Sequence, residues 1–363
     1  MIGVALLGAG YAARIQLDCW REIPEATVIG VWNRSAERAR ALAAEFGVPS
    51  FAELDPLLAH PAVDAVDIAT AVETHRDYAL RAAASGKHVL CQKPLAPSFA
   101  DAVSLVSDCE AAGVRLMVNE NWRWRPWYRA TRDLLDRGAI GRPFSLRLAM
   151  RSAAAVATPE RPPQSLFVRQ PFLRRMQPLI VLELGPHHFD IVRFLFGEPH
   201  DVYARTLKVT PAEHVAGEEV ATALLGYTDR LAQVELSWAS LGYPANAVSP
   251  DLLAIEGTEG SLFVDHDGQV CVSHRDGGQE LIAIDTTDAY RRSWQAALAH
   301  FAGCLASGEP FETSGADNLN TLLLVFAAYD SAATRQVIPI TEVGESVSRS
   351  VGKHEKRLIA DSR

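Results

Sequence analysis

One histidine of this sequence lies between two carboxylates at the spacing of helical turns. Glu183, His187 and Asp190 stand at i, i+4 and i+7, so a single helix would place all three on one face. An acid beside an imidazole can orient it as a general base. Pro186 suits the first turn of such a helix, which leaves Glu183 either inside the helix or in the approach to it. A structural histidine and a metal site are the alternatives, but further ligands at suitable spacing are not evident, and we expect no metal.

A lysine, Lys93, follows a short apolar run within the segment Cys91-Gln92-Lys93-Pro94. If residues 88–91 form a strand of a parallel sheet, Lys93 lies at the carboxyl edge, where such sheets bind ligands. An ammonium group there could hydrogen-bond a substrate hydroxyl and stabilise a developing alkoxide. The alternative is a surface lysine ahead of a turn. We expect Lys93 and His187 to be catalytic, with Glu183 or Asp190 orienting the imidazole.

The chain opens on a glycine motif, Gly8-Ala9-Gly10-Tyr11-Ala12-Ala13, directly after an apolar run at residues 4–7. The first glycine permits a tight turn, the second lets a diphosphate approach bare backbone, and the small Ala13 lets helix pack on strand. The amino end of the following helix favours the diphosphate charge. The motif therefore predicts dinucleotide binding by Gly8, Gly10, Tyr11 and Ala12.

The end of the second expected strand decides which dinucleotide would bind. An acid usually grips the ribose 2′-hydroxyl of NAD at this point. Here Trp32 is followed by Asn33, Arg34 and, one helical turn later, Arg38. Two guanidinium groups and no carboxylate directly after the strand would suit NADP, and the alternative is that the two arginines form only a solvated helix face. NAD and NADP both remain open as cofactors.

The elements that must position these residues follow an alternating pattern over the first 120 residues. Apolar runs at 4–7, 27–32, 65–69, 88–91 and 115–119 alternate with helical patterns at 12–23, 35–46, 51–58, 73–85 and 99–112. This alternation predicts an α/β fold with a Rossmann doubly wound parallel sheet. We assign residues 1–121 to an NAD(P)-binding domain.

The pattern changes after residue 121 to strands with few helices between them. Strands are expected at 144–150, 202–209, 220–227, 232–239, 252–256 and 261–264, and helices at 128–137, 186–196, 290–306 and 317–333. We assign residues 122–363 to a substrate-binding and oligomerisation α/β domain with a large open, mostly antiparallel sheet. Such a sheet needs its open face covered, so we expect a homodimer or homotetramer.

The composition of the chain narrows the classes of molecule that it is expected to bind. The chain has 363 residues and a net charge of -9, which disfavours nucleic acid and anionic membranes and points to a small-molecule substrate. The five scattered cysteines form no CxxC pair, which argues against disulfides and zinc. The first residues are too short a run for a signal peptide, and no apolar stretch would span a bilayer, so we expect a cytoplasmic protein.

Three ordered motifs resemble the Gfo/Idh/MocA family of sugar and polyol oxidoreductases. The Glu-Lys-Pro motif of that family appears as Gln92-Lys93-Pro94, and its Asn-x-Arg-x-x-Pro segment as Asn121, Arg123 and Pro126. Its Asp-x-x-x-His-x-x-Asp motif appears as Glu183, His187 and Asp190. Gln92 and Glu183 depart from the family pattern. The stretch at residues 311–315, among others, resembles members that act on D-apiose-like sugars.

The resemblance implies an NAD(P)-dependent sugar or polyol dehydrogenase and further contact residues. The implied cofactor contacts are Thr70, His75, Gln92, Lys93 and Asn121, and the implied substrate contacts are Lys93, Arg123, Arg169 and His187. In the implied reaction His187 takes the hydroxyl proton, Lys93 stabilises the alkoxide, and hydride passes to the nicotinamide. Two alternatives remain open: a cofactor-binding regulator or sensor on the same scaffold, and an NAD-assisted glycosidase or lyase.

Overall fold

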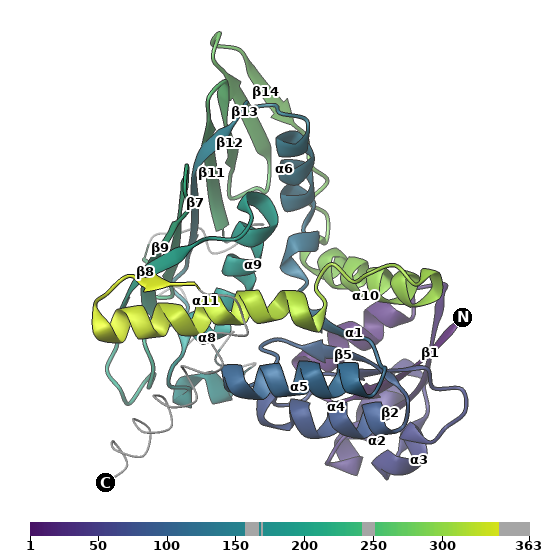
Figure 1. Ribbon diagram of the computed structural model, residues 1–363. Helices are drawn as coiled ribbons and strands as arrows, with labels where there is room; N and C mark the ends of the chain where they lie inside the picture. Colours follow the sequence, from purple (N-terminus) through teal and green to yellow (C-terminus); the bar gives the residue numbers. More distant parts are fainter. Residues whose placement is uncertain (157–166, 168–169, 242–250, 341–363) are drawn as a thin grey trace. The chain divides into compact units, whose positions relative to one another are not determined.

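The structure, a computed structural model, describes residues 1–156, 167, 170–241 and 251–340 (Figure 1). The described residues form two compact units, which are taken in turn. The first contains residues 1–121 with 291–322, and the second contains residues 122–290 with 323–340. The domain expected over 122–363 therefore differs from the second unit, because residues 291–322 pack with the first.

The first unit is built on a parallel sheet of six strands in the order β3-β2-β1-β4-β5-β6. Its strands are β1 (Ile2–Leu7), β2 (Ala26–Trp32), β3 (Ser50–Phe51), β4 (Ala65–Ile68), β5 (His88–Gln92) and β6 (Leu116–Asn119). All six residues of β1 are buried, as expected for a strand covered on both faces. The strand order reverses between β1 and β4, and this is the doubly wound arrangement expected from the sequence.

Helices connect these strands, and most end where the sequence carries a stop signal. They are α1 (Tyr11–Trp20), α2 (Ala36–Phe46), α3 (Leu54–Leu58), α4 (His75–Ala84) and α5 (Phe99–Ala111), with a 3-10 turn, η1 (Val72–Thr74), before α4. Ser35 caps α2 by accepting a hydrogen bond from the Arg38 amide, and Gly47 ends α2 at a φ of 66°. Ser98 caps α5 in the same way.

The helix expected over residues 51–58 is wrong in its first part. Ser50 and Phe51 instead form the short edge strand β3, which pairs with Val31 and Trp32 of β2. The Phe51 ring packs where a side chain on Gly30 would stand, since an added Cβ there would lie 2.5 Å from it. Tertiary packing on β2 thus overrides the local helical pattern, and α3 begins at Leu54.

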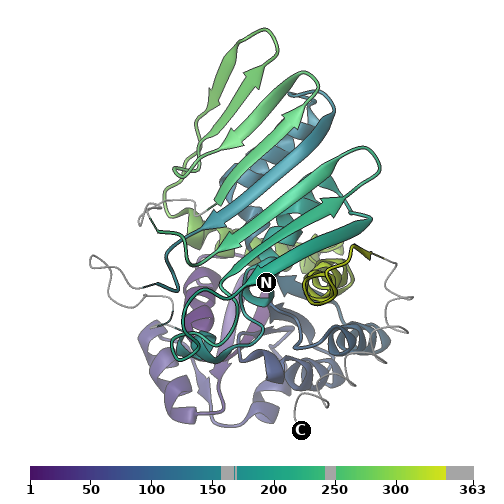
Figure 2. The same ribbon diagram turned by 90° about the vertical axis from the view of Figure 1, so that its left-hand side faces the viewer.

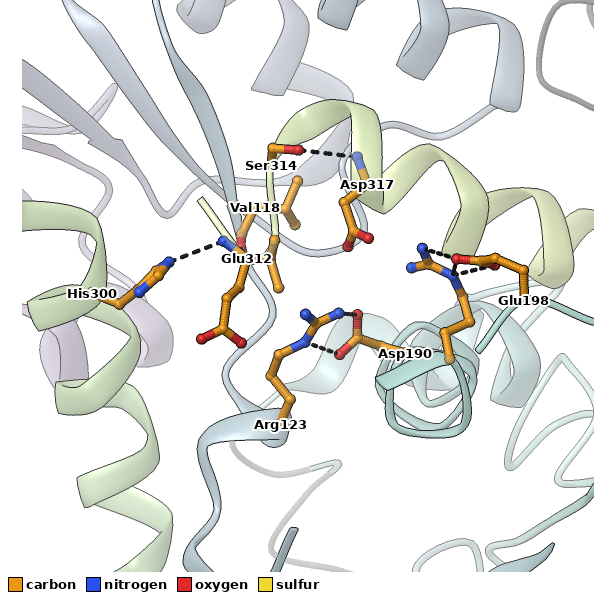
Figure 3. A network of polar contacts seen from close by, with 10 residues as sticks. Val118, Arg123, Asp190, Glu198, His300, Glu312, Ser314 and Asp317 are labelled. Atoms are coloured by element: carbon orange, nitrogen blue, oxygen red, sulfur yellow. Dashed lines mark hydrogen bonds and ion pairs between the residues drawn. The ribbon is translucent and has the colours of Figure 1, made fainter. Parts of the chain in front are cut away.

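Residues 291–322 complete the first unit. They include most of α10 (Ala289–Ser307) and the start of α11 (Gly315–Thr334). Phe301 packs edge to face on Trp20, and the Val118 amide donates to the Thr313 carbonyl. Figure 3 shows the His300 ring, whose Nε2 accepts from the Glu312 amide at 3.0 Å. Close by, Ser314 caps α11, because its Oγ accepts a hydrogen bond from the Asp317 amide.

The second unit is built on a sheet of nine strands (Figure 2). The pairing of β7 with β10 is parallel and the other pairings are antiparallel, which confirms the expected open, mostly antiparallel sheet. In spatial order the strands are β14 (Gln279–Ile282), β13 (Val270–His274), β12 (Gly260–Val264), β11 (Asp251–Gly257), β7 (Pro143–Arg151), β10 (Leu231–Ser237), β9 (Val220–Gly226), β8 (Asp201–Leu207) and β15 (Ile338–Pro339).

One face of the nine-stranded sheet carries the core of the second unit. Alternate residues of β10 point into it, namely Ala232, Val234 and Leu236. Helices lie against this face, as Figure 1 shows for α6 and α9. The helical segments of the unit are η2 (Trp122–Trp124), α6 (Pro126–Asp136), η3 (Pro171–Arg175), α8 (Ile180–Glu183), α9 (Gly185–Phe196) and the end of α11. Within the described ranges, no helix combines the length and apolar character needed to cross a membrane.

Candidate active site

The glycine turn sits at the carboxyl end of β1, at the point where the strand order reverses. Gly8 adopts a φ of 125°, and an added Cβ would stand 2.3 Å from the Ala69 carbonyl oxygen, so the turn requires glycine. Gly10 is the N-cap of α1 and an added Cβ would meet no protein atom within 4 Å. The first turn of α1, with Tyr11 and Ala12, carries no side-chain cap and no acid. Its amides therefore suit the diphosphate of a dinucleotide.

The end of β2 presents a mixed set of polar groups for a ribose. Asn33 donates its side-chain amide to the Ser35 carbonyl at 3.1 Å, so its own carbonyl oxygen is oriented away from that bond. Arg34 and Arg38 are exposed, and Glu37 is exposed in the first turn of α2. The end of β2 and the first turn of α2 thus carry an amide oxygen that can accept from a ribose hydroxyl, two guanidinium groups and one carboxylate. This set fits either a 2′-hydroxyl or a 2′-phosphate.

His75 joins two loops at the carboxyl edge of the sheet. Its ring is 1% exposed, with Nδ1 3.1 Å from the Pro94 carbonyl oxygen and Nε2 3.2 Å from that of Thr70. Burial lowers the pKa of His75, although the backbone carbonyl oxygens of Thr70, Leu95 and Pro94 act in the opposite direction. The side chain thereby braces the loop that carries Lys93. The cofactor contact expected for His75 stays a prediction. Thr70 Oγ1 lies 2.8 Å from Thr74 Oγ1.

Gln92, the last residue of β5, belongs to a buried chain of polar side chains. Its Nε2 donates to Gln16 Oε1 at 3.0 Å, and Gln16 Nε2 donates to Asp67 Oδ1 at 2.5 Å. Trp20 Nε1 donates to the other carboxylate oxygen, Oδ2, at 2.7 Å. Burial raises the pKa of Asp67 to about 7, although the bonds from Trp20 and Gln16 act in the opposite direction.

Sequence reasoning missed Gln16 and Asp67. Asp67 interrupts an otherwise apolar and buried strand, Ala65–Ile68. Burying a carboxylate without hydrogen-bond partners costs free energy, so its position in this strand could have indicated a buried polar partner such as Gln16. Asn121 was expected at the site, and in the structure its Nδ2 donates to Ser293 Oγ at 2.7 Å, with both residues buried.

In the second unit, His187 lies in the first turns of α9 and stacks on an aromatic ring. The His187 and Trp122 rings are 4.3 Å apart between centroids, with planes only 4° from parallel. Arg125 Cζ stands 3.7 Å from the Trp122 ring centroid. Stacking fixes the plane of the imidazole, which is 6% exposed. Sequence reasoning did not assign this contact to Trp122.

Asp190 is paired with Arg123 in a buried, two-pronged salt bridge (Figure 3). Arg123 Nε donates to Oδ2 at 2.8 Å, and Nη2 donates to Oδ1 at 2.5 Å. Both side chains are almost fully buried. Each charge of the pair is thus compensated by the other. The roles expected from the sequence, in which Asp190 orients the imidazole and Arg123 binds substrate, stay predictions. Nearby, Arg193 pairs with Glu198 in the same view.

Glu183 and His187 do not share one continuous helix. Glu183 ends α8, Leu184 intervenes with φ -100° and ψ -29°, and α9 begins at Gly185. The single face expected for Glu183, His187 and Asp190 thus holds only for the last two, as Pro186 near the start of α9 had left open. Arg169 lies outside the described residues.

A second histidine, His188, belongs to a buried charged cluster that sequence reasoning missed. Its Nε2 lies 3.0 Å from Asp251 Oδ1, while Asp251 Oδ2 accepts from Tyr128 Oη at 2.8 Å and from Arg125 Nη1 at 3.3 Å. Burial alone would raise the pKa of Asp251, but His188, Arg125 and Tyr128 outweigh it and hold the pKa below its ordinary value. The cluster anchors Arg125, which in turn lies on the ring that His187 contacts.

The six-stranded order with a glycine turn at its reversal defines a Rossmann-fold dinucleotide-binding protein. Residues 2–120 match the family model described as an oxidoreductase family with an NAD-binding Rossmann fold, and residues 128–263 match the GFO/IDH/MocA C-terminal domain. The chain therefore belongs to the GFO/IDH/MocA family of oxidoreductases, and its cofactor is a nicotinamide dinucleotide. The family expected from the three motifs is confirmed.

Named relatives cover nearly the whole chain. D-apiose dehydrogenase from Paraburkholderia graminis is 38% identical over 93% of this chain and 89% of its own length. D-apiose dehydrogenase from Rhizobium rhizogenes is 34% identical over 93% of this chain and 96% of its own length. The crystal structure of an oxidoreductase from Agrobacterium radiobacter in complex with NAD+, L-tartaric acid and magnesium is 33% identical, with a TM-score of 0.85, and the match covers 93% of this chain and 98% of that one. These relatives support a carbohydrate dehydrogenase.

Among the residues that the structure describes, no three His, Cys, Asp or Glu side chains are grouped as a metal site would require. The expectation of a metal-free site stays a prediction.

Proposed function

We propose that this protein is an NAD-dependent dehydrogenase of D-apiose or a closely similar small sugar. The observation that carries the proposal is the identity of 38% over 93% of the chain with a protein named D-apiose dehydrogenase. The glycine turn, whose second glycine leaves its backbone open, supports the cofactor part of the proposal. Bound NAD would supply a hydride acceptor at its nicotinamide ring.

The residues of this chain then take separate roles in the reaction. His187 accepts the proton of the sugar hydroxyl, and stacking on Trp122 holds its ring in one plane for this transfer. Lys93, in the loop braced by His75, stabilises the alkoxide that develops as the proton leaves. Glu183 orients the imidazole, and Arg169 binds the sugar. The salt bridge between Arg123 and Asp190 holds α9 against η2.

The test is turnover by purified protein with a panel of sugars and both dinucleotides. We expect formation of NADH with D-apiose, at a kcat/KM at least about tenfold above that with a cyclic polyol such as myo-inositol. Equal or better use of the polyol would contradict the substrate assignment. Cofactor binding without turnover on any sugar would favour a regulator, and product without net NADH would favour a glycosidase or lyase.

The proposed preference for NAD rests on the end of β2. The carbonyl of Asn33, oriented by the bond from its amide to Ser35, suits a ribose hydroxyl, and the exposed carboxylate of Glu37 would repel a 2′-phosphate. Arg34 and Arg38 would still allow weaker binding of NADP.

We predict that Arg38→Ala weakens NADPH binding by about tenfold and NADH binding by less than about twofold, as measured by quenching of protein fluorescence. Equal losses for both dinucleotides would contradict this role.

We also propose that the protein self-associates through the outer face of its nine-stranded sheet. On that face Leu224, Leu231 and Phe263 are between 45% and 53% exposed, on three different strands. Polar residues such as Gln233 and Arg147 lie between them, and exposed apolar side chains set among polar ones suit a surface that a second copy covers. The cysteines in the described residues are all free thiols, which supports a cytoplasmic location.

A further inference from the structure

The buried chain from Asp67 to Gln92 runs from the middle of the parallel sheet to its carboxyl edge. Asp67 on β4 and Gln16 on α1 are fully buried, and Gln92 at the end of β5 is 6% exposed. Each glutamine amide has one donor end and one acceptor end. The orientation of one amide in such a chain therefore determines the orientation of the next.

The observed orientations are those that an ionised Asp67 requires. A carboxylate only accepts, so Gln16 turns its Nε2 toward Asp67 and its Oε1 toward Gln92. Gln92 must then turn its Nε2 inward to Gln16, which leaves its Oε1 at the outer end. No described residue donates a hydrogen bond to that oxygen. Gln92 thus presents an acceptor at the carboxyl edge, beside Lys93.

A protonated Asp67 would reverse the whole chain. Trp20 Nε1 is a donor only, so it continues to occupy Oδ2, and the new proton lies on Oδ1. That hydroxyl donates to Gln16 Oε1, Gln16 Nε2 then donates to Gln92 Oε1, and Gln92 Nε2 becomes the outer group. Every buried group keeps a partner in either state, so the reversal leaves none of them unsatisfied.

We propose that Asp67 and Gln16 are positioning residues that set whether Gln92 offers an acceptor or a donor to the bound cofactor. The inference rests on the proposed function, because it takes Gln92 to face the dinucleotide. With Asp67 ionised, the Gln92 carbonyl accepts from a group that can only donate, either the carboxamide N–H of the cofactor or the Lys93 ammonium. With Asp67 protonated, an N–H group faces the same partners and binding weakens.

The neighbours of Asp67 leave it as the group that titrates. From β5, Cys91 interacts with it, but burial raises the pKa of that thiol well above its ordinary value, so it stays neutral. From α1, Asp18 pairs with Arg291, and the Cys19 thiol donates to the Arg291 carbonyl. From α4, His75 is held between backbone carbonyls, and β1 has no titratable residue. With the pKa of Asp67 raised to about 7 by burial, the reversal falls near physiological pH.

The first experiment is the pH dependence of NADH affinity, measured by fluorescence quenching in the whole protein. We expect the wild-type affinity to rise by about three- to tenfold as the pH goes from 6 to 8. In the Asp67→Asn variant, the new oxygen accepts from Trp20 and the new NH2 donates to Gln16, so the chain is permanently reversed. Its affinity should be low and independent of pH. A pH dependence equal to that of the wild type would overturn the proposal.

The second experiment tests the chain itself, without any cofactor. In the Gln92→Glu variant at pH 8, two carboxylates face the ends of one glutamine, so Gln16 must turn its oxygen toward one of them. We expect a marked loss of stability in urea at pH 8 that largely disappears at pH 5. Adding Asp67→Asn should restore stability at pH 8, because the new NH2 donates to Gln16 and Gln16 Nε2 donates to the carboxylate.

Additive effects of the two substitutions on unfolding would overturn the coupling through Gln16. Coupling in the unfolding cycle without any change in the pH profile of NADH binding would overturn the assignment of Gln92 to the cofactor. Asp133→Asn, which removes an exposed carboxylate on α6, is the charge-matched control and should change neither measurement. Neither measurement depends on sugar turnover, so failure of the substrate assignment remains separately visible.

Discussion

At the residue scale, the contact that best explains how His187 could act as a base is its stack on Trp122. A single helix through Glu183 and His187 was expected to provide the orienting group, but Leu184 separates α8 from α9. The parallel Trp122 ring fixes the imidazole plane whichever carboxylate orients the ring, and Arg125 lies on the same Trp122 ring. Such a contact joins residues 65 positions apart in the chain, so no local spacing rule could have revealed it.

This stack predicts a graded effect of substitution at position 122. Trp122→Phe keeps an aromatic face and should lower kcat by less than about threefold, whereas Trp122→Leu should lower it by about tenfold or more. NADH affinity should stay unchanged in both variants, which separates a positioning effect from misfolding. Equal kcat values for the two variants would show that stacking does not position His187.

The buried carboxylate of Asp67 predicts an unusual pH dependence of stability. Its pKa is about 7 in the folded protein and 3.8 when unperturbed, so the folded state keeps the proton that the unfolded state has lost between these values. The free energy of unfolding should therefore fall as pH rises from about 4 to about 7, by at most on the order of 4 kcal/mol from this group.

Comparison with the Asp67→Asn variant isolates that contribution. Urea unfolding across pH 4 to 8 should show the variant gaining stability relative to the wild type as pH rises. A constant difference between the two proteins across this range would mean that the pKa of Asp67 is not raised.

At the scale of elements, the sequence pattern was most informative where a strand and its connecting helix form one local unit. The alternation over the first 120 residues predicted the parallel sheet, because β1, β4 and β6 are buried along their whole length and α2 and α5 begin at serine caps. Elements that depend on distant partners were missed. The edge strand β3 forms only on β2. The strand β14 was missed for another reason: it forms a local hairpin with β13, and its mostly exposed residues show no buried alternation.

The turn between β1 and α1 predicts that its two glycines fail in different ways. Gly8→Ala should destabilise folding, because the backbone has a φ of 125° and the new Cβ would stand 2.3 Å from the Ala69 carbonyl oxygen. Gly10→Ala meets no protein atom, so its melting temperature should stay close to that of the wild type. NADH affinity should nevertheless drop by about tenfold or more, since the new methyl group would occupy the diphosphate position. Thermal unfolding and NADH titration of both variants would check this, and an unchanged NADH affinity in Gly10→Ala would contradict it.

At the scale of the whole molecule, the order of elements along the chain does not follow the division into units. Residues 291–322 return to the unit that holds the Rossmann sheet, where Arg115 lies 4.1 Å over the Phe311 ring and the Val118 amide bonds Thr313. The helical pattern at 290–306 and 317–333 does not by itself indicate which of the two units each helix joins. That choice depends on tertiary contacts such as the packing of Trp20 on Phe301.

Self-association is the property of the whole molecule that the sheet predicts most directly. Phe263 projects from β12 on the outer face and is 45% exposed, while its neighbours Leu262 and Val264 are buried. If two copies pair through this face, a two-fold axis brings each substitution into the interface twice. Phe263→Glu should then convert dimer or tetramer to a smaller species in multi-angle light scattering. Val337→Glu, which changes an exposed apolar residue outside the strands, should leave the mass unchanged. A wild-type protein that is monomeric at micromolar concentration, or a Phe263→Glu variant of unaltered mass, would exclude this face as the interface.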